Sequence, residues 1–325
     1  MLKPKILIYG MDDWSHARVY WDLVNNLTEH FTIDYISWYR SGHDLDWRGL
    51  AAIYSAILID MDSVLEHLDT MFLPCEVREK ILLINHGPQQ VADYTFKSKS
   101  TRLQNYTDKE LLAQDLNLFK LIACVSPNTI HSVKKETPSL ANKLRLTSLG
   151  VNENNFPKST FTREKLNSLG YFTHVDSTKG QGMDTKRGFL AHIVARNSGV
   201  PMHLINDVNF KFMDLWYKQI DVYLMTSIYE SGPLPLLEAG VCGIPIIASP
   251  AGLAPQFLSN GGGVLTETFD ENEYIRTAVN TIAFWRENPT QLKAESIRIR
   301  ENTLEYFTWG KVKQQWIDVI NEFIA

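Results

Sequence analysis

The stretch from Tyr223 to Gly252, YLMTSIYESGPLPLLEAGVCGIPIIASPAG, decides how the rest of the chain is interpreted. It opens with an apolar strand pattern and runs through polar and turn residues to Pro233, which fits the first turn of a helix because a missing N–H costs little there. The mostly apolar residues 234–241 predict a short buried helix, and Gly243 ends it before the apolar strand IPIIAS. The stretch therefore predicts a strand, a loop, a helix and a second strand.

Two carboxylates flank the start of this helix. Glu230 is on the loop before it, and Glu238 is in its body, where a charge among apolar neighbours is costly unless it is paired or reaches a ligand. Helical side chains lean toward the N-terminus, so Glu238 can point back toward the start of the helix. Glu230 borders the same place, and the free amides of the first turn face it. Hydroxyls suit the carboxylates and phosphates suit the amides, and a nucleotide-diphosphate sugar has both. Taken singly, each acid better fits an ordinary role, as a solvated loop acid or a core acid held by backbone N–H groups.

The pair with its surroundings, ESGPLP between the acids and CGIPIIAS after them, resembles the E-x7-E donor-binding signature of the GT-B retaining glycosyltransferases of family 4. The resemblance implies that Glu238 holds the ribose hydroxyls and that Glu230 contacts the sugar. It also implies that amides near Gly232 and Leu234 stabilise the diphosphate as it leaves. Two neighbouring loop residues join the expected donor site, Tyr229 and Ser231.

Length and composition agree with a two-domain globular protein. The 325 residues suffice for two cores, and 44% hydrophobic with 21% charged residues is typical of soluble proteins. The net charge of -5 predicts no broad nucleic-acid footprint, and three scattered cysteines indicate neither a disulfide framework nor a metal site. No apolar run is long enough for a signal peptide or a membrane span. We therefore predict a cytoplasmic protein; attachment to a membrane surface stays open, although no strongly basic amphipathic helix favours it.

The first half of the sequence alternates strand and helix patterns. A helix is predicted over 17–27, and apolar strands over 5–9, 31–37, 56–60, 81–85, 121–126 and 144–149. Such alternation predicts a parallel sheet covered on both faces, whose ligands gather at the carboxyl ends of the strands. His86 follows one strand directly and resembles the family's N-domain histidine that faces the transferred sugar; a lone histidine here is as often structural. Asp13, in the loop from Gly10 to His16, is a further substrate-binding candidate, although the loop lacks the paired glycines common in the family.

The second half begins after the polar linker GVNENNFP at 150–157, which resembles the family's crossing between domains. A strand at 169–175 and a helix at 188–198 enclose a glycine-bearing loop rich in cations. The family neutralises the donor diphosphate with an arginine at the strand end and a lysine before the helix. In this chain Thr173 and His174 occupy the place of that arginine. Arg187 best matches the helix-side cation, and the other substrate-binding candidates of this region are Lys179, Lys186 and His174.

The C-terminal region completes the predicted organisation. Strands are expected at 202–205, 221–225 and 264, with amphipathic helices at 271–284 and 291–306. The FTW sequence before the last helix resembles GT-B proteins, in which that helix returns to the first domain; Trp309 and Trp316 are expected to be packing anchors. We predict two Rossmann-like domains with parallel sheets facing a cleft. Residues 1–150 form the acceptor-side domain, 151–305 the nucleotide-sugar-binding domain and 306–325 the returning helix.

The predicted function is that of a metal-independent retaining glycosyltransferase. It would need no cofactor and would use a UDP- or GDP-sugar with an unidentified acceptor hydroxyl, on a glycan, a lipid-linked sugar, a small molecule or a modified nucleic acid. Three alternatives stay open. A GT-B epimerase would need carboxylates of the first domain, such as Asp12, Asp13 and Asp93. A non-catalytic sugar-nucleotide binding protein fits the missing arginine and glycine pair, and a transferase acting on DNA is mildly disfavoured by the acidic net charge.

Overall fold

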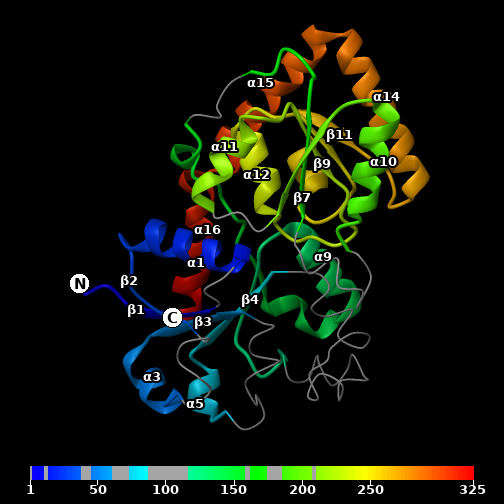
Figure 1. Ribbon diagram of the computed structural model, residues 1–325. Coiled ribbons are helices and arrows are strands. Elements are labelled where there is room, and N and C mark those ends of the chain that lie inside the picture. The colour runs from blue at the N-terminus through cyan, green and yellow to red at the C-terminus, as the bar shows by residue number, and fades with distance from the viewer. Residues whose placement is uncertain are drawn as a thin grey trace. The chain divides into compact units, whose positions relative to one another are not determined.

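The computed structural model describes most of the chain and divides it into two compact units (Figure 1). The first unit comprises Met1–Leu149 and Val312–Ala325, and the second comprises Gly150–Lys311. Each unit has its own parallel sheet, so the predicted α/β class is confirmed. None of the helices in the described part is long and apolar enough to cross a bilayer. The described residues are 2–10, 14–37, 45–60, 73–86, 116–157, 162–173, 185–206 and 210–325.

The sheet of the first unit has six parallel strands in the order β2-β1-β3-β4-β5-β6. Its central strands β3 and β4 are buried along their whole length, which is why they read as unbroken apolar runs in the sequence. The strands are β1 (Lys5–Gly10), β2 (Thr32–Ser37), β3 (Ala56–Asp60), β4 (Ile81–Asn85), β5 (Ile122–Cys124) and β6 (Leu144–Leu146).

Helices cover both faces of this sheet. The helices α3 (Trp47–Ile53), α5 (Cys75–Arg78) and α9 (Pro127–Glu136) pack on one face, and α1 (Trp14–Leu27) lies on the other beside α16 (Trp309–Ile324) (Figure 1). The predicted strand over 121–126 is too long, because Ser126 caps α9: its Oγ accepts a hydrogen bond from the backbone N–H of Thr129 at 3.2 Å. The strand over 144–149 is likewise shorter than predicted, and α1 begins three residues before the predicted position.

The sheet of the second unit has five parallel strands in the order β11-β10-β9-β7-β8. The helices α10 and α14 share one core with this sheet, and α11 and α12 lie on its opposite face (Figure 1). The strands are β7 (Leu169–Thr173), β8 (Met202–Asn206), β9 (Val222–Met225), β10 (Ile246–Ala248) and β11 (Gly263–Leu265). The helices are α10 (Gly188–Ser198), α11 (Met213–Tyr217), α12 (Leu234–Val241), α13 (Ala254–Phe257), α14 (Glu271–Glu287) and α15 (Pro289–Tyr306).

The buried helix α12 differs from its prediction at its start. Pro233 is the N-cap residue with an extended ψ of 110° rather than a residue of the first turn, and the helix begins at Leu234. Along its body α12 packs closely against α15. A Cβ on Gly240 would lie 2.3 Å from Oγ1 of Thr303, so a glycine is needed for the two helices to approach this closely.

Two arginines hold the C-terminal end of α12. Arg163, 1% exposed, donates from Nη1 to the carbonyl oxygen of Cys242 at 3.2 Å, and Arg300 donates from Nη1 to that of Val241. Burial lowers the pKa of the Arg163 guanidinium to about 10. The last carbonyl groups of a helix lack partners within the helix and form the negative end of its dipole. The two arginines give these carbonyl groups donors and place positive charge at the negative end of the dipole. They therefore fix the orientation of α12 at its C-terminal end.

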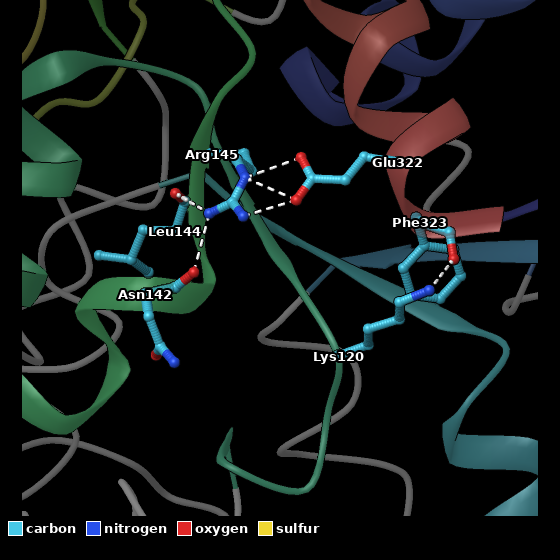
Figure 2. Close-up of polar contacts among 6 residues, drawn as sticks. All are labelled: Lys120, Asn142, Leu144, Arg145, Glu322 and Phe323. Atoms are coloured by element: carbon cyan, nitrogen blue, oxygen red, sulfur yellow. Dashed lines mark hydrogen bonds and ion pairs between the residues drawn. The ribbon is translucent and has the colours of Figure 1, made fainter. Parts of the chain in front are cut away.

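The C-terminal helix α16 belongs to the first unit from Val312 onward. Trp316 is fully buried and donates from Nε1 to the carbonyl oxygen of Ser148 at 3.0 Å. Trp309 is buried as well, so both tryptophans are packing anchors, as predicted. The end of the helix is attached to the edge of the sheet by ionic contacts (Figure 2). Arg145 of β6 donates from Nε and Nη2 to the Glu322 carboxylate at 2.6–3.1 Å, and Lys120 donates to the carbonyl oxygen of Phe323 at 2.7 Å.

Replacing Glu322 by Gln is expected to lower the free energy of unfolding by at most about 1 kcal/mol at neutral pH, because the pair is half-exposed and screened by solvent. The hydrogen bond from Arg145 holds the pKa of the Glu322 carboxyl below its ordinary 4.5 in the folded protein. The pair therefore stabilises the protein above the unfolded-state pKa, and this contribution is lost as the pH falls through the lower folded-state pKa.

Urea unfolding of both proteins at about pH 7 and about pH 3 measures this difference. Asp318→Asn is the control, because it removes a charge from an exposed position of the same helix that no cation is seen to pair. The expectation would be contradicted if the free energies of unfolding of wild type and Glu322→Gln differ by the same amount at both pH values. It would also be contradicted if Asp318→Asn lowers the free energy of unfolding as much as Glu322→Gln does.

Candidate active site

The loop between β9 and α12 carries the first predicted site residue, Glu230. Its Oε1 accepts hydrogen bonds from Oγ of Ser227 at 2.9 Å and from Nζ of Lys186. The side chain of Glu230 is 13% exposed and that of Lys186 is 30% exposed. The sequence assigned these two residues to different parts of one ligand, the sugar and the diphosphate. The structure brings them into direct contact, as an ion pair at the start of the buried helix.

The turn at 185–187 is fastened to this loop through its backbone. The amide of Ile228 donates to the carbonyl oxygen of Thr185 at 2.9 Å. The carbonyl oxygen of Lys186 accepts hydrogen bonds from the hydroxyl groups of Tyr171, at 3.1 Å, and Thr226. The backbone of Lys186 is thus held by a residue of β7 and by the residue directly after β9. This fixes the region that its ammonium group can occupy, and Glu230 lies in that region.

Arg187, the predicted helix-side cation, is used within the fold. It is 5% exposed, and its guanidinium donates to the carbonyl oxygens of Thr226 at 2.7 Å and Phe269 at 2.6 Å. Its φ of 48° is uncommon for a residue with a side chain and stores strain of a kind found at functional sites. Arg187 thus stabilises the walls of the site, and Lys186 is the more exposed of the two cations.

Glu238 is buried in the body of α12, with 4% of its surface exposed. Its Oε2 accepts a hydrogen bond from the hydroxyl group of Tyr217 in α11 at 2.8 Å. Burial, and next the Glu238 carboxylate, raise the pKa of Tyr217 well above its ordinary value, so this hydroxyl stays a donor. Sequence reasoning missed Tyr217, although it lies on the helix directly before β9. A tyrosine hydroxyl is thus one of the partners that satisfy the carboxylate.

A glycine closes the other side of the loop. Gly252 has a φ of 55°, and a Cβ there would lie 2.6–2.7 Å from backbone atoms of Glu230 and Ser231. The segment after β10 can therefore contact the Glu230 loop only with glycine at this position. Ser249 adds a hydrogen bond from its hydroxyl group to the carbonyl oxygen of Ser227. The E-x7-E pair and the glycine after β10 are thus parts of one folded site.

The other predicted donor-site residues fall into two groups. Those of the loop and helix start lie beside Glu230, with Tyr229 and Gly232 partly exposed and Ser231 and Leu234 buried. Asp13, His174 and Lys179 lie outside the described residues, as do Asp12 and Asp93. In the described ranges no three His, Cys, Asp or Glu side chains gather as a metal-binding group.

In the first unit, His86 follows β4 at the carboxyl end of the sheet. Its Nε2 lies 3.4 Å from Oδ2 of Asp60, the last residue of β3, and its ring meets the ring of Tyr20 edge-on with centroids 6.1 Å apart. A Cβ on Gly10 would lie 2.2 Å from the Tyr20 ring, so this strand-end glycine makes room for the tyrosine. Sequence reasoning missed Asp60 and Tyr20. The available signal was that Asp60 ends a buried strand at the edge where His86 begins.

Several solved structures share this architecture. Sucrose-phosphate synthase from Thermosynechococcus elongatus superposes with a TM-score of 0.69 at 13% identity, over 99% of this chain and 100% of that one. The catalytic domain of starch synthase IV from Arabidopsis thaliana, bound to ADP and acarbose, gives 0.68 at 10% identity over 99% of both chains. HepE from Anabaena in complex with UDP and glucose gives 0.64 at 16% identity over 98% and 100%. The chain therefore has the GT-B fold.

The sequence comparisons concern the second unit. Residues 191–298 match the family described as Glycosyl transferases group 1. The alpha-maltose-1-phosphate synthase of Mycolicibacterium smegmatis is 24% identical over 110 residues. That match covers 32% of this chain and 28% of the relative's length. The matched family region contains Glu230, Glu238 and the N-terminal end of α12.

Proposed function

We propose that the protein is a retaining glycosyltransferase of the family 4 type, which transfers a sugar from a UDP- or GDP-sugar to an acceptor hydroxyl. The observation that carries the proposal is the Lys186–Glu230 ion pair at the start of α12. It combines a cation that suits a diphosphate with a carboxylate that suits sugar hydroxyls, beside amides that suit phosphate oxygens. Three free cysteines agree with a cytoplasmic setting.

The donor would be held by the second unit. Glu238, fixed by Tyr217, would accept hydrogen bonds from the ribose hydroxyls, and Glu230 would accept them from the sugar. The amides of Gly232 and Leu234, the positive end of the α12 dipole and Lys186 would stabilise the diphosphate. Because Arg163 and Arg300 satisfy the opposite end of α12, this arrangement is fixed before the ligand arrives, as electrostatic catalysis requires.

The chemistry proposed for this site needs no group beyond the donor and the acceptor. The bond between the anomeric carbon and the diphosphate oxygen breaks as the acceptor oxygen bonds to the same face of the sugar. The electron pair of the broken bond goes to the diphosphate, which accepts the proton of the acceptor hydroxyl. Stabilising the negative charge of the leaving group is then the main task of the protein, and Lys186 with the amides of Gly232 and Leu234 would do so. The proposal includes no metal and no cofactor.

A donor screen tests the proposal directly. UDP-, GDP- and ADP-sugars are offered singly, and the thermal midpoint of unfolding is measured, because a ligand that binds only the folded state raises it. The donor that binds is then incubated with candidate acceptors, and release of the nucleoside diphosphate is followed. An isomerised sugar formed from donor alone would favour the epimerase instead. If no sugar nucleotide shifts the midpoint, the proposal fails.

Glu238→Gln is expected to raise the dissociation constant of the donor about 10- to 100-fold, because a hydrogen bond to a charged group contributes about 1.5–3 kcal/mol. Isothermal titration calorimetry measures the change. Glu295→Gln is a matched control in the same unit: Glu295 is also buried, but its Oε2 accepts from the amide of Gly262 at 2.7 Å, behind β11. An unchanged donor affinity in Glu238→Gln would show that the ribose role is wrong.

A further inference from the structure

The carboxyl end of the first sheet holds a buried carboxylate that the proposed donor site does not use. Asp60 ends β3 and is 1% exposed. Its Oδ2 lies 3.4 Å from Nε2 of His86 and 3.5 Å from the hydroxyl oxygen of Tyr20. A carboxylate with so little contact to water is costly unless hydrogen-bond donors or a cation compensate it. Both contacts converge on one oxygen, so His86 and Tyr20 serve this carboxylate together.

The strand order makes this contact a property of the sheet. β3 and β4 are adjacent and parallel, with Asp60 paired to Ile84, so the ends of the two strands lie side by side. Tyr20 reaches the same point from α1, because Gly10 at the end of β1 leaves room for its ring. β3 and α1 therefore carry Asp60 and Tyr20, and His86 directly follows β4. A group that acts through geometry is best placed on such elements.

The carboxylate restricts the protonation of the histidine. A neutral imidazole carries its proton on one of two nitrogens, and the partner of each nitrogen decides which. With Nε2 facing the Asp60 carboxylate, a proton on Nε2 is attracted to it, whereas a lone pair on Nε2 would be repelled. Within the part of the chain that the structure describes, the titratable side chains seen against this ring are Asp60 from β3 and Tyr20 from α1.

We propose that Asp60 is a positioning residue: its carboxylate keeps a proton on Nε2 of His86 and fixes the orientation of the ring, so that His86 presents this proton in one geometry at the carboxyl end of the first sheet. The proposal deepens the glycosyltransferase function and rests on it for the role of His86 in turnover. Asp60 itself touches neither donor nor acceptor in this scheme. Its removal should therefore lower the turnover number and leave the binding of the donor nearly unchanged.

Histidine NMR tests the proposal without any assay of activity. The protein is labelled with 15N-histidine, and the signals of His86 are assigned by their loss in His86→Gln. In the wild type we expect the neutral imidazole to carry its proton on Nε2. In the isosteric variant Asp60→Asn we expect the Nδ1-protonated form to appear beside it, because a neutral amide attracts the Nε2 proton less than a carboxylate does. With a donor in hand, we expect kcat to fall about 10-fold and the donor KM to change less than about 2-fold, because a displaced ring lowers the rate more than the affinity.

Asp34→Asn is the control, because Asp34 is a carboxylate of the same sheet that accepts from a tyrosine hydroxyl, Tyr54 at 2.7 Å, and pairs with Lys5 rather than with a histidine. It should leave the His86 tautomer and kcat as in the wild type. A neutral His86 imidazole whose proton is on Nδ1 in the wild type overturns the proposal even if Asp60→Asn does not fold. An unchanged His86 tautomer and kcat in a folded Asp60→Asn also overturn it. If the NMR results hold but no sugar nucleotide is used, the glycosyltransferase function fails and the Asp60–His86 pairing stands.

Discussion

Glu230→Gln is expected to lower the rate of sugar transfer about 100-fold and to raise the affinity for the free nucleoside diphosphate a few-fold. The loss has the size found when one group that stabilises the transition state is removed, about 2.7 kcal/mol. The gain arises because Glu230 holds the ammonium group of Lys186 in the unliganded chain. A neutral amide releases this cation, which is then available to a diphosphate. Opposite signs for the two effects distinguish this site from one in which Glu230 has only a structural role.

The test compares four proteins, namely the wild type, Glu230→Gln, Lys186→Gln and the double variant. Calorimetry gives the affinity for UDP or GDP, and steady-state assays give the transfer rate. Lys186→Gln should weaken binding of the nucleoside diphosphate, and in that background Glu230→Gln should no longer strengthen it. Glu164→Gln, which breaks an exposed pair with Lys293 in the same unit, is the charge-matched control. The expected release of Lys186 from Glu230 to the diphosphate is refuted if Glu230→Gln weakens the binding of the free nucleoside diphosphate as much as it weakens the binding of the sugar nucleotide.

Arg163→Met is expected to lower the free energy of unfolding of the second unit by about 3–5 kcal/mol, because it leaves buried polar groups without partners. The guanidinium donates to the carbonyl oxygens of Ile220 at 3.0 Å, Cys242 at 3.2 Å and Tyr217 at 2.7 Å. Methionine fills much of the volume but donates nothing, and the site is too buried for water to replace the lost donors readily. Two of the carbonyls lie at the end of α11 and just after it, and the third follows α12, so their common donor fastens the end of α12 to the connection from α11 to β9.

Urea unfolding measures this loss through the midpoint and the slope of the transition. Arg196→Met, at an exposed position of α10, is the control and should change the free energy of unfolding by no more than about 0.5 kcal/mol. Arg163→Lys should lie between Met and wild type, because an ammonium group cannot reach three separate carbonyls as a planar guanidinium does. A cost for Arg163→Met below about 1 kcal/mol would mean that water or a local shift satisfies the carbonyls.

The elements that were predicted well share a local cause. The strands β3 and β4 and the helix α10 have the predicted bounds. Each of these elements ends at a polar residue or before a glycine, so its end can be read from the local sequence. Gly199 ends α10 with a φ of 64°, a conformation in which glycine is favoured. The bounds were wrong where a side chain decides them. Ser126 caps a helix within a run that reads as strand, and Pro233 caps α12 rather than entering it.

The sequence predicted which residues belong to the candidate site, but not which of them contact one another. The E-x7-E spacing singles out Glu230 and Glu238 because both acids belong to one short segment. Lys186 and Glu230 are 44 residues apart, and Arg163 reaches carbonyls 54 to 79 residues away. Such contacts depend on which strands become neighbours in the sheet, and no periodicity in the sequence records this. Asp60 and His86 are found together only once β3 and β4 are known to be adjacent.

The chain enters and leaves the second unit at neighbouring points. It passes between the units twice, after Leu149 and, within α16, after Lys311. The segments that lead to these crossings are tied to each other within the second unit, because the amide of Val151 donates to the carbonyl oxygen of Phe307 at 2.9 Å and the amide of Trp309 donates to the carbonyl oxygen of Val151 at 3.2 Å. The entry and the exit of the second unit are therefore fastened together by its own backbone, and a change that loosens one of these segments loosens the other as well.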